Sequence, residues 1–249
     1  VTGDIDASSV SAPQETIRVG PIRIDGAQTP GPFGYPLGSM DLSIDSVSIQ
    51  SAYNDLSVGL VTLHSRVAAT GSLVDADATL RIADLRSPLG NAEVAWEARI
   101  RGADGEGLGQ ALNLRQYQGD PDLAWAALKE SEAGLEALLA TGMELHFDQF
   151  DLVLPQGTMT STLHLTVHES HPDEMSWAAI ILALDGTLEL GLSQGMVDFI
   201  TGQFPEFGGA VALGYLRKSG DLYETLVEIR SGVLSINGAP MQSPLDAFQ

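Results

Sequence analysis

The sequence contains no cysteine, and this absence excludes every structure or activity that needs a thiol. Without thiols the chain can form no disulfide, no thiolate zinc site and no cysteine nucleophile. Lysine is nearly as scarce, because only Lys129 and Lys218 occur among 12 basic residues, and the formal net charge is −21. A surface this negative repels phosphate backbones and anionic lipid headgroups. We therefore expect no nucleic-acid partner and no electrostatic attachment to a membrane surface.

Long hydrophobic runs and catalytic signatures are also missing. No apolar run approaches the roughly 20 residues of a transmembrane helix, so we expect no membrane-spanning segment. The chain starts at Val1 without a basic and then apolar signal region, and we expect a processed or truncated form whose anchor or signal lies upstream. The Gly-x-Ser-x-Gly nucleophile elbow is absent. The Gly105-Glu-Gly-Leu-Gly109 run lacks the strand-then-helix context of a phosphate-binding loop. We therefore assign no catalytic or cofactor-binding residue and expect no cofactor.

What the sequence does contain is the two-residue alternation of β-strands. From Thr16 onward most segments alternate apolar and polar residues, and turn-forming pairs such as Asp104-Gly105 and Asn237-Gly238 separate them. Short connections of this kind join antiparallel neighbours. The pattern predicts a mainly β (α+β) fold, in which an elongated, curved antiparallel sheet forms a single domain over residues 16–249. Residues 1–15 are predicted to be a flexible leader.

Helical signals interrupt this alternation at residues 122–141, 194–201 and, more weakly, 108–114. Asp120-Pro121 is an N-cap followed by a first-turn proline, and leucines follow it at helical spacing. Ser193 is a suitable N-cap for the shorter helix. Two further apolar runs are assigned to strands, at residues 177–184 and 210–217.

One alternating pattern occurs twice, and it changes phase midway in both copies. In Asp41-Leu-Ser-Ile-Asp-Ser-Val-Ser-Ile49 and in Glu144-Leu-His-Phe-Asp-Gln-Phe-Asp-Leu152 the apolar residues switch between odd and even positions. A strand cannot keep both sets on one face without an extra residue. We therefore predict a β-bulge or kink at Asp45-Ser46 and at Asp148-Gln149. If this pattern marks an internal repeat, the chain consists of two similar halves, at about 16–118 and 119–249. Chance similarity between two amphipathic strands is the alternative.

These segments also resemble a known family. The residues that carry the resemblance are Leu37-Gly-Ser-Met-Asp-Leu-Ser-Ile-Asp-Ser-Val-Ser-Ile49, the run 138–157, and the hairpins 214–223 and 232–241. Together they look like the C-terminal part of the YdgA-like family of bacterial envelope proteins of unknown function. The resemblance implies a periplasmic protein attached to the inner membrane through an N-terminal anchor. It supplies no catalytic residues, and the acidic, lysine-poor composition departs from the family.

The histidines form one local cluster, His164, His168 and His171, with Asp173 and Glu174 nearby. Imidazole and carboxylate are suitable zinc ligands. In a strand, however, His164 and His168 stand about 13 Å apart at roughly 3.3 Å per residue, which is too far for one ion. His168 and His171 could share an ion across a turn with a third ligand from elsewhere, but neither spacing matches an established motif. We therefore predict surface polar residues here and no metal site.

Five aromatic residues are candidate ligand or partner contacts: Phe33, Tyr35, Phe199, Phe204 and Phe207. The first two lie in a Pro/Gly-rich loop, and the others lie near the second predicted helix. Apolar groups on loops can form the mouth of a ligand site or a docking patch. The alternative is that they seal the ends of the sheet core.

The leading functional hypothesis is a non-enzymatic periplasmic binding or scaffold module. A curved sheet lined by leucine, isoleucine and valine can hold a lipid or another apolar ligand if helices do not fill its groove. The second hypothesis is a protein–protein interaction module of an envelope assembly, acting through a sheet edge or an apolar patch. An enzyme of unknown type ranks third, because no constellation has the residue types of a catalytic site.

Overall fold

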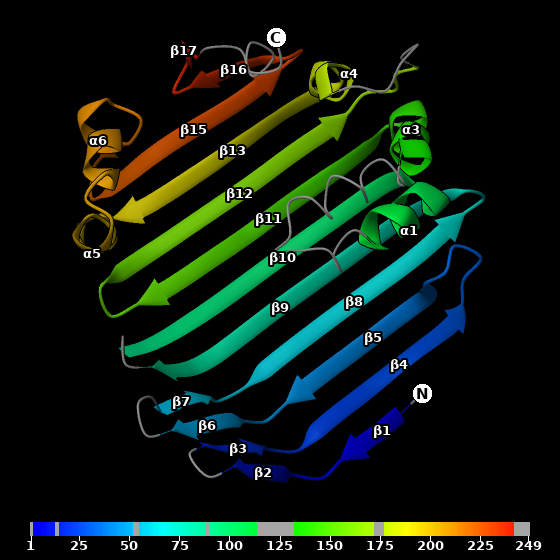
Figure 1. The fold of residues 1–249 in the computed structure, drawn as a ribbon, viewed down its shortest axis with the longest axis vertical. Coiled ribbons are helices and arrows are strands. Elements are labelled where there is room, and N and C mark those ends of the chain that lie inside the picture. Colours follow the sequence, from blue (N-terminus) through cyan, green and yellow to red (C-terminus); the bar gives the residue numbers. More distant parts are fainter. Residues whose placement is uncertain are drawn as a thin grey trace.

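The computed structural model describes residues 2–12, 15–51, 55–87, 90–113, 132–171 and 177–241. Within these ranges the chain is mostly β and forms an open antiparallel sheet with short helices (Figure 1). This architecture confirms the fold class that the two-residue alternation predicted.

The strands follow one another closely along the chain. The first ten are β1 (Thr2–Ile5), β2 (Ser8–Ala12), β3 (Glu15–Val19), β4 (Ile22–Pro30), β5 (Pro36–Ile44), β6 (Val47–Ser51), β7 (Asp55–Val58), β8 (Val61–Thr70), β9 (Leu73–Ser87) and β10 (Gly90–Asp104). The later ones are β11 (Met143–Leu154), β12 (Gly157–Val167), β13 (Leu184–Ser193), β14 (Arg217–Ser219), β15 (Leu222–Arg230), β16 (Val233–Ile236) and β17 (Ala239–Pro240). The described helices are α1 (Gly105–Asn113), α3 (Glu132–Thr141), α4 (Trp177–Leu182), α5 (Gln194–Gln203) and α6 (Phe207–Ala212).

Strands from both halves of the chain join in one sheet. Its main order is β1-β4-β5-β8-β9-β10-β11-β12-β13-β15-β16-β17, and every pairing is antiparallel. A side branch, β2-β3-β6-β7, joins β9, and β14 lies beside β15. The two predicted halves therefore share a single hydrogen-bonded layer. That the two halves have similar folds stays a prediction.

Both predicted phase changes coincide with irregularities in the strands. β5 ends before Asp45-Ser46 and β6 begins after it, with Gly20 N donating to Ser46 O at 2.7 Å across the break. In β11, Phe147 pairs with Leu163 and Phe150 with Ser161, so two residues of β11 oppose one of β12. This arrangement is a β-bulge at Asp148-Gln149. The phase of the apolar residues therefore located both irregularities correctly.

The predicted helices agree with the structure where it describes them. α5 begins after Ser193, whose side chain accepts a hydrogen bond from Met196 N, and Met196 and Val197 are buried. α1 covers most of the weak helical turn over 108–114. α3 forms the second part of the helix predicted over 122–141, and residues 122–131 lie outside the described ranges. None of the described helices has the length and apolarity needed to cross a membrane.

Two strand predictions are wrong. Residues 177–182 form α4, and 207–212 form α6, which overlaps the strand predicted over 210–217. Both runs are short and apolar, and such runs do not show by periodicity whether they form a buried strand or a helix. The pair Asp185-Gly186, which follows the first run, has the composition of a turn, yet it lies inside β13.

Residues 1–15, which the sequence predicts as a flexible leader, contain β1 and β2. Thr2 of β1 pairs with Asp25 of β4, and Ser8 of β2 pairs with Val19 of β3. β1 is exposed along its whole length. An exposed strand with a single neighbour needs no apolar alternation, so the sequence pattern does not reveal it.

Candidate binding surface

Apolar side chains lie opposite one another from strand to strand across the sheet. One row runs from β4 to β15 and consists of Ile22, Ile44, Val61, Ile82, Val94, Leu152, Met159, Leu192 and Tyr223. Neighbouring strands lie about 4.8 Å apart, so this row is roughly 38 Å long. The antiparallel register therefore assembles a long apolar strip from residues far apart in sequence.

Further apolar rows run beside the first on the same face. The next row contains Ile24, Leu42, Leu63, Leu80, Trp96 and Phe150. Another contains Ala98, Phe147, Leu163, Leu188, Val227 and Ile236. We call the surface made by these three rows the apolar face. Trp96 and Phe147 connect two of the rows, with their ring centroids 5.9 Å apart.

Most side chains of the apolar face are only partly buried. Every residue of the second row retains some solvent exposure, and in the first row only Leu192 is fully buried, at 1% exposed. The largest fully buried side chains among the described residues are Leu192, Met196 and Val74. Among the described residues, the centre of this face is therefore only partly covered, whereas a two-layer protein has its core there.

α5 and α6 cover the end of the apolar face at β12, β13 and β15. Met196 and Val197 of α5 join Leu192 and Leu216 in a buried cluster. Phe199 and Phe207 pack against this cluster, whereas Phe204 is 59% exposed. Two of the three candidate aromatics at this end therefore contribute to the core, and the third faces solvent.

Phe33 and Tyr35 lie at the opposite end of the strands, at the tip of the β4–β5 hairpin (Figure 1). The Phe33 ring is so close to α1 that a Cβ on Gly105 would lie 2.6 Å from it. The Tyr35 hydroxyl donates to Gly105 O at 3.0 Å. Burial, assisted by the nearby Asp104 carboxylate, raises the pKa of Tyr35. The five candidate aromatics thus form two separate groups, of which Phe33 and Tyr35 fasten the hairpin to α1.

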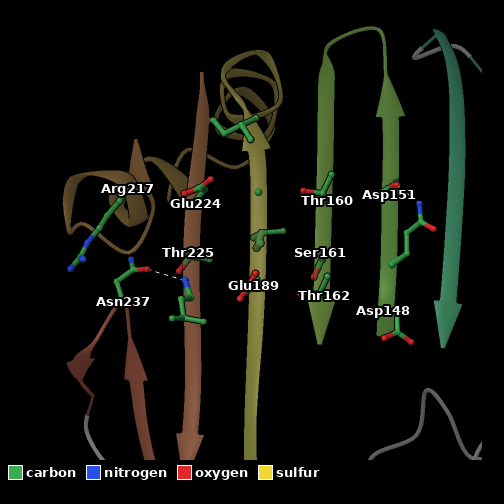
Figure 2. Close-up of a pocket in the computed structure, with 15 residues that line it drawn as sticks. Asp148, Asp151, Thr160, Ser161, Thr162, Glu189, Arg217, Glu224, Thr225 and Asn237 are labelled. Carbon is green, nitrogen blue, oxygen red and sulfur yellow. Dashed lines mark hydrogen bonds between the residues drawn. The ribbon is translucent and has the colours of Figure 1, made fainter. Parts of the chain in front are cut away.

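A shallow groove of about 430 Å³ crosses β11, β12, β13 and β15 (Figure 2). Polar residues predominate in its lining, including Asp151, Thr160, Thr162, Glu189 and Glu224. These side chains occupy the strand positions that alternate with the apolar rows, and we call this side of the sheet the polar face. Its carboxylates make the groove suited to cations or hydrogen-bond donors rather than to apolar molecules.

Three histidine contacts lie along the polar face. His64 Nδ1 lies 2.7 Å from Asp41 Oδ1, and His168 Nε2 lies 2.9 Å from Asp185 Oδ2. His146 of β11 meets His164 of β12 at the same level of the sheet. Sequence reasoning considered His164 together with His168 and missed His146. The alternating pattern in the sequence does not show which residue lies opposite His164. The β11–β12 register shows that this residue is His146.

Hydrogen bonds fix two aspartates beside these histidines. Arg99 of β10 forms an ion pair with Asp148, and its hydrogen bond holds the pKa of Asp148 below the usual range. The hydrogen bond from His168, followed by that from Ser231 N, lowers the pKa of Asp185. His171 is exposed, whereas Asp173 and Glu174 lie outside the described residues.

A family model described as a bacterial protein of unknown function (DUF945) matches residues 1–244. The chain belongs to this family. No curated protein and no solved structure matches it. Membership of the DUF945 family agrees with the expected resemblance to bacterial proteins of unknown function, and it assigns no activity to any residue.

Proposed function

We propose that this chain is a non-enzymatic binding module that holds a lipid, or another elongated apolar molecule, on its apolar face. The observation that carries the proposal is the unbroken row of apolar side chains from Ile22 to Tyr223, most of them partly exposed. An antiparallel sheet normally buries such a face against a second layer. Apolar surfaces left open on this scale are typical of ligand-binding grooves and interaction sites.

The dimensions of the apolar face suit an acyl chain. Half of a bilayer's hydrocarbon core is about 15 Å thick, which approximates the reach of one acyl chain. Because α5 and α6 cover the row from Leu152 to Tyr223, its open part runs from Ile22 to Val94 and is roughly 19 Å long, slightly more than this reach. Burying apolar surface contributes about 25 cal/mol per Å², so a chain lying along this row would be held without any polar contact.

The net charge of −21 favours uptake of single molecules over adsorption to a membrane surface. Anionic headgroups are repelled by a surface of the same sign. A lipid with a neutral or zwitterionic headgroup can instead place its acyl chain on the apolar face while its headgroup stays in water. We therefore assign a zwitterionic lipid as the preferred ligand class.

A pair of double variants tests this proposal. Leu63 and Leu80 are neighbours on the apolar face, and Thr62 and Thr79 are the preceding residues of the same strands on the polar face. We expect L63Q/L80Q to bind a phosphatidylethanolamine with a fluorescent acyl chain at least tenfold more weakly than the wild type. The reason is that it removes apolar contact from the centre of the second row, which lies directly beside the first.

T62Q/T79Q is the matched control, because it places the same amides on the same strands but on the opposite face. It should bind the labelled lipid as the wild type does. Thermal unfolding of each variant without lipid shows whether the sheet is intact. Equal binding by both variants, or no binding by the wild type, would refute the lipid proposal.

The cellular location belongs to the same proposal. The resemblance of the chain to YdgA-like proteins supports a position facing the periplasm, attached to the inner membrane through an N-terminal anchor of the full-length protein. Fractionation of bacterial cells is expected to place the full-length protein in the inner-membrane fraction. Recovery from the cytosol would contradict this location.

An alternative proposal is a protein-interaction module of an envelope assembly. The observation that favours it is the exposure of Phe204 and Leu213, at 59% and 70%, on either side of α6. Large apolar side chains beside a short helix can dock on a partner. Concentration-dependent self-association that F204S/L213S abolishes, without loss of lipid binding, would support this alternative.

A further inference from the structure

Two imidazoles meet on the polar face, one from each strand of the β11–β12 hairpin. His146 and His164 are direct register partners, and their Nδ1 atoms lie 2.7 Å apart. Their rings are nearly perpendicular, at 81°, with the centroids 4.9 Å apart. Only one of two facing Nδ1 atoms can donate a proton to the other. One shared proton therefore lies between the two nitrogens, and both nitrogens can act as ligands for a metal ion once that proton leaves.

A carboxylate lies beside the two imidazoles. Asp148 is at the bulge of β11, and the candidate ligand atoms of His146, Asp148 and His164 all lie within 4.8 Å of one another. Bulges often redirect a side chain beside a functional site. The same irregularity that the alternating pattern predicts thus brings a third ligand of the right type to the histidine pair.

We propose that His146, His164 and Asp148 form a binding site for a divalent transition-metal ion of the zinc, nickel or copper class. Imidazole nitrogen and carboxylate oxygen are the ligands that these ions accept. A tetrahedral zinc with bonds of 2.0–2.1 Å needs its two nitrogens about 3.3 Å apart. The imidazoles reach this spacing by opening slightly, and the ion takes the place of the proton between them.

Outer contacts already hold the ligands in suitable orientations. Glu144 Oε2 lies 3.2 Å from His146 Nε2, so this carboxylate engages the nitrogen of His146 that faces away from His164. A partner on the remote nitrogen is the usual device that orients a metal-binding histidine. Arg99 positions Asp148 through its ion pair, and each carboxylate oxygen keeps a second lone pair for a metal.

The other histidine contacts on the polar face provide an internal comparison. His64 with Asp41, and His168 with Asp185, each bring one imidazole to one carboxylate. Among the residues that the structure describes, the group with three potential ligands is His146, Asp148 and His164. Affinity for the metal should therefore depend on the His146–His164 pair and not on the number of histidines.

Metal titration of the intact, chelator-treated chain tests the proposal. By calorimetry with Zn²⁺, we expect one ion per chain to bind to the wild type. H146Q and H164Q should each weaken binding at least tenfold, because losing even an outer partner of a metal ligand costs about 10- to 100-fold in affinity. Co²⁺ should give visible absorption bands in the wild type that are absent from H164Q.

H64Q is the matched control, since it removes an exposed histidine from the same face and should bind Zn²⁺ as the wild type does. Unchanged metal-free thermal unfolding of H146Q and H164Q would show that lost binding is not lost folding. Failure of the wild type to bind Zn²⁺, Ni²⁺ or Cu²⁺, or wild-type affinity in H164Q, would overturn the proposal. Lipid binding lies on the opposite face, so its outcome is independent of this one.

Discussion

At the scale of single residues, Asp185 connects three segments of the sheet through one carboxylate. One oxygen contacts His168 Nε2 beyond the end of β12, and the other accepts from Ser231 N in the β15–β16 turn, both at 2.9 Å. Ser231 has a φ of 47°, a left-handed conformation that is uncommon for residues other than glycine. The carboxylate therefore ties a strained turn to the neighbouring strands.

Asp185→Asn is expected to reduce the free energy of unfolding at neutral pH and to lose its effect in acid. The pKa of Asp185 is lowered in the folded chain, so its stabilisation is present above the unfolded value of about 3.9 and disappears as the pH falls through the folded value. Urea unfolding of both proteins at pH 5 and pH 3 measures this. A difference that is as large at pH 3 as at pH 5 would contradict the assignment.

The histidines show why residue-level prediction was incomplete. The sequence spacing of His164 and His168 correctly indicated that one ion cannot bridge them along a strand. His146 precedes His164 by 18 residues, and nothing local to either residue indicates that they pair. Their contact depends on the register of the β11–β12 hairpin, which the bulge shifts.

At the scale of elements, Ser193 links β13, α5 and β12. Its Oγ accepts from Met196 N at 3.4 Å in the first turn of α5 and from Thr158 N at 2.9 Å in β12. The N-cap was predictable from the sequence because serine followed by an apolar helical face is a local signal. The second hydrogen bond is tertiary and was not predictable.

Ser193→Ala is expected to lower the free energy of unfolding by about 1–2 kcal/mol, because it removes a helix cap and leaves Thr158 N without this acceptor. Chemical denaturation measures the change. Ser219→Ala in β14 is the control, since Ser219 is exposed and its loss should change stability by less than about 0.5 kcal/mol. Equal effects from both substitutions would show that the cap contributes nothing.

Helix and strand were confused at residues 177–182, where the local signals conflict. The 177–182 run contains tryptophan and isoleucine, which favour strands, beside alanine and leucine, which favour helices. In the folded chain β12 pairs instead with β13, which starts at Leu184. Because β13 takes the position beside β12, the 177–182 run is not needed as a strand there and forms α4.

At the scale of the whole molecule, the open sheet separates two surfaces with different chemistry. The apolar face continues from β4 to β15, while the carboxylates and histidines occupy the alternating positions on the polar face. An open sheet with both surfaces accessible can bind an apolar ligand on one side and a cation on the other. The two proposed activities should be separable, because L63Q/L80Q changes only the apolar face and H146Q only the polar face.

Trp96 can report on ligand binding at the apolar face, because it lies in the second row between Leu80 and Phe150 and is partly exposed. A phospholipid with brominated acyl chains is expected to quench part of the tryptophan fluorescence. Trp96→Phe keeps an aromatic ring there and should abolish most of the quenching while the lipid still binds. Unchanged quenching in Trp96→Phe would place the acyl chain elsewhere.

The sequence alone determined the mostly β character, the cap at Ser193 and the two strand irregularities. Each depends on residues that are neighbours along the chain, where alternation and capping act. The tertiary structure decided that Ile22 and Tyr223 share one row, and that His146 meets His164. These contacts depend on strand order and register, which are set by pairing between distant segments. The surfaces that carry the proposed functions therefore arise from the assembly of the sheet.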